Sequence, residues 1–79
     1  MNEPEILAKL TEILEGVTKG KVTIDIKTDL IEQNILDSLD GMVFMLEVEQ
    51  AFDKQFPEDI NLVKEGYYKV GKLVEFLRG

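Results

Sequence analysis

The chain has no cysteine and no histidine among its 79 residues. Without cysteine there is no disulfide or thiolate nucleophile, and without histidine there is no imidazole base or imidazole metal ligand. Paired carboxylates such as Asp37 and Asp40 could in principle act as acid and base, but nothing in the sequence places a pocket around them. We therefore expect no metal site, and we expect that the protein is not an enzyme.

The sequence also lacks long apolar runs and a basic beginning. No apolar run approaches the roughly 20 residues of a membrane span. The first five residues are acidic where a signal peptide would be basic. A chain of 79 residues is short enough for one small core. We expect a single domain over residues 1–79 that is cytoplasmic, monomeric and not bound to membranes.

Basic residues are scarce, with 9 Lys and Arg against 16 Asp and Glu, a formal charge of −7. This balance argues against binding nucleic acid or anionic lipid and favours basic protein partners. The excess of acidic residues is concentrated in one part of the sequence, because residues 28–53 contain seven acids and no base. These acids are Asp29, Glu32, Asp37, Asp40, Glu47, Glu49 and Asp53. Such patterning is a property of a surface and its partners.

Apolar residues at helical spacing predict a first helix that begins with a capping box of Asn2 and Glu5 and stops at Gly16 or Gly20. Residues 18–36 are predicted to form a long loop. Its segment 22–26 alternates like a strand but has no second run to pair with. A turn is expected at Thr28 and Asp29. The expected core anchors of the loop are Leu30, Ile31, Ile35 and Leu36.

A second helix is predicted from Asp37 or Ser38 to about Lys54, ended by Phe56-Pro57. Placed at 100° intervals, one group of side chains forms the expected core face: Phe44, Met45, Val48, Ala51 and Phe52. A second group, here called the outer apolar strip, falls among polar residues: Leu39, Met42, Val43 and Leu46. Asp40, Glu47 and Asp53 flank this strip. Exposed apolar strips mark contact sites, so we expect these seven residues to bind partners.

After Pro57 the sequence predicts a short element through Ile60, Leu62 and Val63, and then a last helix from about Val70 to Arg78. Tyr67 and Tyr68 are expected to pack on the core with hydroxyls that reach water. The predicted fold is all-α. It is a small four-helix bundle of three main helices and one short helix, with a long loop between the first two.

Ser38 is the remaining residue with possible chemistry. Its simplest interpretation is an ordinary helix N-cap, for which Ser and Asp are favoured. It also follows a long loop and starts an acidic helix that carries the outer apolar strip. There it would present its hydroxyl to another protein with no base to activate it. This context favours a substrate for modification.

The sequence contains a set of motifs that are typical of a known protein family. They are residues 29–32, 35–40 and 49–53, together with Phe56-Pro57. With Asp37-Ser38-Leu39 at a helix start, the chain resembles an acyl or peptidyl carrier protein over nearly its whole length. The resemblance implies that Ser38 carries 4′-phosphopantetheine, attached by a phosphopantetheinyl transferase acting with coenzyme A and magnesium. Asp37 and Leu39 would be its motif neighbours, with Asp37 helping to orient magnesium. The absence of cysteine agrees with this resemblance, because a carrier of thioesters without cysteine needs a prosthetic group to supply its thiol.

The implied function is to hold acyl or aminoacyl groups as thioesters and deliver them from a loading enzyme to a downstream synthase or transferase. Ile35-Leu36 differs from the Gly-Ala of fatty-acid carriers, and Val43 stands where those carriers usually have an acid. We therefore expect a specialised lipid, polyketide or peptide pathway instead of housekeeping fatty-acid synthesis. The alternative is an acidic helical interaction module without a prosthetic group, which docks through the outer apolar strip. A gain in mass on incubation with coenzyme A and a transferase would discriminate between the two.

Overall fold

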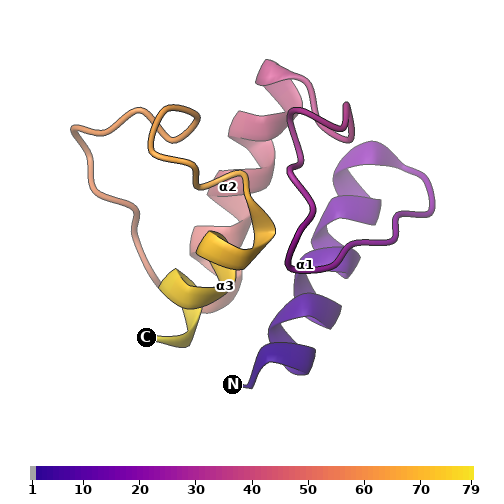
Figure 1. Cartoon of the computed structure of the whole chain (residues 1–79), viewed down its shortest axis with the longest axis horizontal. Coiled ribbons are helices and arrows are strands. Elements are labelled where there is room, and N and C mark those ends of the chain that lie inside the picture. The colour runs from indigo at the N-terminus through magenta and orange to yellow at the C-terminus, as the bar shows by residue number, and fades with distance from the viewer. Residues whose placement is uncertain (1) are drawn as a thin grey trace.

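The computed structural model describes residues 2–79 and contains three helices in that range: α1 (Glu3–Thr18), α2 (Ser38–Phe52) and α3 (Val70–Arg78). Figure 1 shows that α1 begins at the end of the molecule where α2 and α3 finish. No strand forms in the described chain, where the only sheet-like pairing is an isolated antiparallel bridge between Asp29 and Lys69. The all-α prediction is confirmed. None of the helices between residues 2 and 79 is long and apolar enough to cross a bilayer.

The predicted capping box of α1 is present. The Asn2 side chain accepts the Glu5 N–H at 3.0 Å, and the Glu5 carboxylate accepts the Asn2 N–H at 3.3 Å. Of the two predicted stops, Gly16 is wrong because it lies inside the helix, whereas the helix does end directly before Gly20, with Lys19 as its left-handed cap at a φ of 59°. The Lys19 N–H donates to the Glu15 carbonyl at 2.8 Å, which closes the last turn without glycine.

The core is made by the inward faces of all three helices and by anchors from the loops. The buried helical residues are Ile6, Leu10 and Leu14 of α1, Gly41, Phe44, Met45 and Val48 of α2, and Val70, Leu73, Val74 and Leu77 of α3. Two residues of the predicted core face of α2 are not buried in the structure: Ala51 is exposed, and Phe52 is only half-buried. Ala51 lies at the edge of the inward face, beside a shallow groove between α1 and α2, where its small side chain leaves space unfilled.

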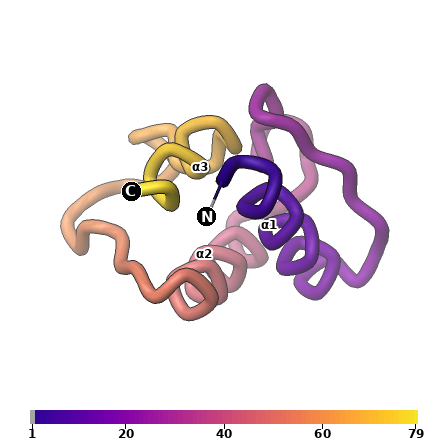
Figure 2. Tube along the Cα trace, turned by 90° about the horizontal axis from the view of Figure 1, so that it is seen from below, coloured from indigo at the N-terminus to yellow at the C-terminus, as the bar shows by residue number. Residues whose placement is uncertain are grey.

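Residues 19–37 form the predicted long loop. Leu30 and Leu36 are buried as expected, and Ile31 and Ile35 pack half-buried against the same core. The predicted turn at Asp29 is also confirmed, because its carboxylate accepts the N–H groups of Ile31 and Glu32 at 3.0 and 2.9 Å. Figure 2 shows this loop and residues 53–69 on opposite sides of the helices.

Residues 53–69 do not contain the predicted short fourth helix; within the described chain they form turns. One helix-like bond forms, from the Glu65 N–H to the Asn61 carbonyl at 2.9 Å. Gly66 then adopts a φ of 80° and Tyr67 donates back to Leu62. One hydrogen bond does not compensate for the conformational entropy that is lost when the first helical turn forms, so the turn does not extend into a helix. At the other end, α2 closes at Phe52 and the left-handed cap is Asp53.

Hydrogen bonds and ring packing hold residues 53–69 against the helices. The Glu49 carboxylate accepts the Phe56 N–H at 2.8 Å, and the Lys54 ammonium donates to the Phe76 carbonyl at 3.0 Å. The rings of Phe56, Tyr67 and Phe76 then cluster with centroids 4.8 to 5.7 Å apart. This segment is therefore fixed alongside α2, where it can form one wall of a site.

Candidate functional site

Ser38 is the first residue of α2, its side chain is exposed, and it is the only serine in the chain. The N-cap is Asp37, whose carboxylate accepts the Asp40 N–H at 2.7 Å while its carbonyl accepts the Gly41 N–H at 2.8 Å. Asp37 is therefore the N-cap residue of α2. The interpretation of Ser38 as an ordinary N-cap is wrong, and its hydroxyl is not needed to start the helix.

The loop before Ser38 holds it in place. The N–H groups of Ile35 and Leu36 both donate to the Leu30 carbonyl, at 3.0 and 2.9 Å. Leu36, which lies two residues before the serine, is only 2% exposed and packs in the core. On the other side, Phe44 anchors α2 in the same core. The Ser38 hydroxyl is thus presented at the surface from two buried anchor points.

The electrostatics at Ser38 combine two opposing influences. The start of a helix favours an anion, because its first N–H groups and its dipole point outward with positive charge. The carboxylates of Asp37 and Asp40 lie in the same turn. No cluster of three or more potential metal ligands forms anywhere between residues 2 and 79. The site can therefore accept an anionic group at the helix start while its rim stays acidic.

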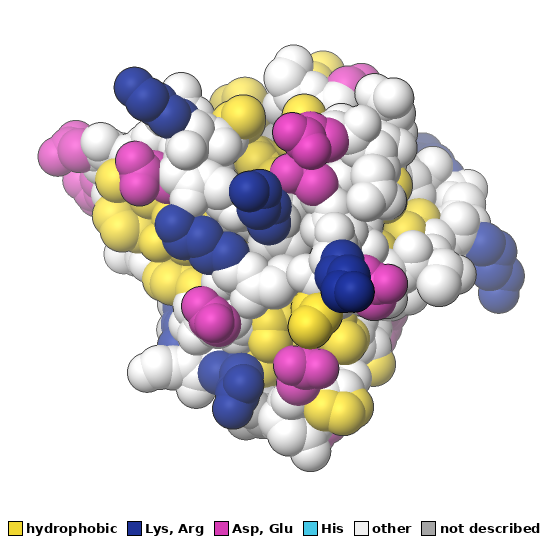
Figure 3. Space-filling view, in the orientation of Figure 1, with side chains coloured by type: hydrophobic (Ala, Val, Ile, Leu, Met, Phe, Trp, Pro, Cys, Tyr) yellow, Lys and Arg dark blue, Asp and Glu magenta, His cyan; other side chains and the backbone are white. Residues whose placement is uncertain are grey.

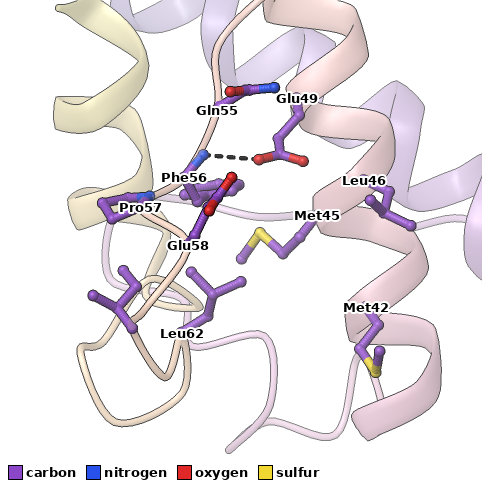
Figure 4. A pocket seen from close by; sticks show the side chains of 10 residues that line it. Met42, Met45, Leu46, Glu49, Gln55, Phe56, Pro57, Glu58 and Leu62 are labelled. Atoms are coloured by element: carbon purple, nitrogen blue, oxygen red, sulfur yellow. Dashed lines mark hydrogen bonds between the residues drawn. The ribbon is translucent and has the colours of Figure 1, made fainter.

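A cavity of about 340 Å³ lies beside Ser38. Its lining is mostly apolar and comes from the loops and α2: Ile31, Ser38, Met42, Ile60, Asn61, Leu62, Val63 and Tyr68. A second cavity of about 450 Å³ shares Met42, Ile60 and Leu62 with it and continues to Phe56 and Pro57. Figure 4 shows the second cavity between α2 and residues 55–62, with the Glu49–Phe56 hydrogen bond at its edge. The two cavities adjoin at these three residues and are here together called the α2 groove.

The α2 groove was not predicted from the sequence. Ile60, Leu62 and Val63 were expected only in a short connecting element, and no role was expected for Gly41. A signal was present, because a glycine inside a predicted helix needs a packing or functional reason. The reason is the Tyr68 ring, which lies against Gly41.

The outer apolar strip is exposed as predicted. The exposed fractions are 70% for Leu39, 65% for Met42, 44% for Val43 and 60% for Leu46. The flanking Glu47 and Asp53 are exposed and Asp40 is half-buried. By contrast, the face seen in Figure 3 carries lysines and acids side by side. α2 thus combines exposed apolar side chains with charge of one sign.

A search of curated proteins finds a relative over nearly the full chain. An acyl carrier protein of Prochlorococcus marinus (strain MIT 9515) is 35% identical over 82 residues, covering 98% of this chain and 94% of the relative. No family model matches the chain. No solved structure matches it either.

Proposed function

Because the chain belongs to the acyl carrier protein family, whose members are carriers and not enzymes, we propose that Ser38 carries 4′-phosphopantetheine and that acyl groups travel on it as thioesters. One observation carries the proposal. The only serine of the chain is exposed at the start of α2, is freed from capping by Asp37, and opens onto the α2 groove.

The residues present suit such a group. The helix start favours the phosphodiester, and Asp37 stands next to it, where it can orient the magnesium that accompanies coenzyme A during attachment. Attachment would join the Ser38 oxygen to the phosphorus that bears the pantetheine and break the pyrophosphate P–O bond of coenzyme A. The adenosine bisphosphate would leave, and the hydroxyl proton would pass to a base of the transferase. The group would supply the thiol that a chain without cysteine lacks.

The outer apolar strip is the proposed docking surface for a phosphopantetheinyl transferase, a loading enzyme and a downstream synthase or transferase. Leu39 adjoins the attachment site, Asp40 and Glu47 supply acids on the same helix, and Asp53 supplies one at its C-terminal cap. Such acids would steer basic partners towards the strip, and desolvated apolar contacts would set the dissociation rate. The departures at Ile35, Leu36 and Val43 favour partners from a specialised lipid, polyketide or peptide pathway.

The test is the intact mass of the wild type and Ser38→Ala after incubation with coenzyme A, magnesium and a broad-specificity transferase. The wild type should gain one phosphopantetheine, and the variant should gain none. The variant should keep its fold, because Ser38 is exposed and Asp37 supplies the cap. A circular dichroism melt of both proteins checks this point. Equal modification of wild type and variant would contradict the assignment.

A second candidate function is an acidic interaction module without a prosthetic group, favoured by the exposure of the outer apolar strip alone. It predicts a folded wild type that stays unmodified with every transferase tried. The same mass measurement therefore separates the two functions.

A further inference from the structure

The start of α3 is capped by the long loop and not by a side chain of its own. Lys69, the N-cap residue, makes no side-chain hydrogen bond to the helix. The first N–H groups of a helix have no partner within it, so they need one elsewhere. The Val70 N–H donates to the Thr28 carbonyl at 2.9 Å, and the Gly71 N–H donates to the Ile26 carbonyl at 3.0 Å. Figure 1 shows the loop passing the start of α3.

Residues 26–30, here called the strap, also hold the segment that leads into Ser38. Leu30, at the end of the strap, is 0% exposed. Its carbonyl accepts the N–H groups of Ile35 and Leu36 at 3.0 and 2.9 Å. The strap therefore caps α3 with its first residues and supports the approach to Ser38 with its last. Through it, the start of α3 and the start of α2 are connected by backbone hydrogen bonds.

Gly71 allows the strap to approach α3 this closely. It is the second residue of the helix and its φ is not positive, so alanine would suit the helix better. A Cβ at this position, however, would lie 2.8 Å from the Ile26 carbonyl oxygen, which is closer than van der Waals contact. The obstacle is a backbone atom, which cannot rotate away as a side chain can. A side chain at residue 71 therefore displaces the strap from α3.

A turn at the beginning of the strap directs its carbonyls towards α3. The Thr28 side chain is 6% exposed, and its hydroxyl accepts the Asp25 N–H at 3.0 Å. The Thr28 N–H donates back to the Asp25 carbonyl at 3.1 Å, and the Asp25 carboxylate accepts the Lys27 N–H at 2.8 Å. These bonds fix the backbone on both sides of Ile26, so its carbonyl has one direction in the folded chain.

We propose that Gly71 is a positioning residue for the modification of Ser38: it admits the Ile26 carbonyl to the start of α3, and the strap held there keeps Ser38 in the orientation that the transferase binds. The inference rests on the proposed function. Gly71 acts through Ile26 and Leu30. With the strap displaced, only a fraction of the folded molecules presents Ser38 correctly, and the apparent affinity of the transferase falls by that fraction.

The first experiment measures attachment of phosphopantetheine to the wild type, Gly71→Ala and the matched control Gly16→Ala, which has nothing within 4 Å of the new Cβ. Initial rates with coenzyme A and a broad-specificity transferase are followed by intact mass over a range of carrier concentrations. The temperature is one at which circular dichroism shows all three proteins folded. In Gly71→Ala the KM for the carrier should rise about threefold or more with kcat unchanged, whereas Gly16→Ala should match the wild type.

The second experiment compares amide hydrogen exchange in the wild type and Gly71→Ala by nuclear magnetic resonance. The amides of Leu30, Ile35 and Leu36 should lose protection at least about tenfold more than the amide of Leu10, in the middle of α1. An equal loss at all four amides would show that Gly71 affects only global stability, and would overturn the proposal. This measurement needs neither coenzyme A nor a transferase.

If Gly71→Ala does not fold, Thr28→Val takes its place in both experiments. It removes the hydroxyl that accepts the Asp25 N–H and keeps the shape of the side chain, so it loosens the turn without adding bulk. An unchanged KM, or a fall in kcat alone, would show that the strap does not position Ser38. If the wild type gains no phosphopantetheine, the proposed function is wrong. If it is modified but Gly71→Ala behaves as Gly16→Ala does, only the inference about Gly71 is wrong.

Discussion

The two apolar faces of α2 differ in exposure, although their side chains are alike. On the inner face Phe44, Met45 and Val48 are at most 3% exposed. On the outer face the four residues of the outer apolar strip are between 44% and 70% exposed. Burial on the inner face stabilises the fold by roughly 1.5–3 kcal/mol for each large side chain. The outer residues contribute little of this, so their apolar character has to be explained by what they contact outside the chain.

Charge sharpens the same comparison. The acids of α2 lie around the outer face and no base neutralises them between residues 28 and 53. Elsewhere lysines also make contacts within the fold, as Lys54 does with the Phe76 carbonyl and ring. Among the α2 acids, Glu49 accepts the Phe56 N–H, whereas the exposed Glu47 and the half-buried Asp40 keep their charge available for another molecule.

The largest expected effect comes from breaking the inner face. Phe44→Ala should lower the free energy of unfolding by about 3–5 kcal/mol, because a fully buried ring is removed from a small core. Leu46→Ala, 60% exposed on the outer face, should change it by less than about 0.5 kcal/mol. Urea unfolding followed by circular dichroism measures both. Similar losses in the two variants would remove the distinction between the faces.

A smaller effect is expected at Gly41, on the inner face beside Ser38. Gly41→Ala should destabilise the fold by about 1–2 kcal/mol, because the new Cβ forces the Tyr68 ring to move and this outweighs the gain in helix propensity. The matched control is Gly16→Ala in α1, where nothing lies within 4 Å. That variant should be more stable by up to about 1 kcal/mol. Equal changes of the same sign would show that the ring at Gly41 adapts without cost.

The smallest effect on stability is expected on the outer face, at Val43. Val43→Glu should leave the melting temperature nearly unchanged, because the side chain is 44% exposed. It places an acid where fatty-acid carriers usually have one. If the strip selects partners, loading by the protein's own enzyme should weaken and use by fatty-acid enzymes should improve. A large loss of stability would show that Val43 belongs to the core, and unchanged loading rates would show that the strip does not choose partners.

Much of the local structure could be predicted because its causes are local. The capping box at Asn2 and Glu5 satisfies N–H groups within one turn, and the start of α2 follows from Asp37 capping Asp40. The two faces of α2 follow from helical spacing, although Ala51 shows that the edge of a face is ambiguous by one position. The fourth helix was predicted wrongly, because turn chemistry at Asn61 and Gly66 outweighed an apolar spacing spread over a few residues.

The sequence by itself determined the three main helices, the acid excess of residues 28–53, the exposed outer apolar strip and the position of Ser38 at a helix start. Each of these depends on residues within a few positions of one another. Only the tertiary structure decided the groove beside Ser38 and the contact between Tyr68 and Gly41. Those residues are 27 positions apart and meet because the Tyr68 backbone pairs with Leu30. Packing between distant segments decides what space remains around a reactive group, and no local pattern encodes that space.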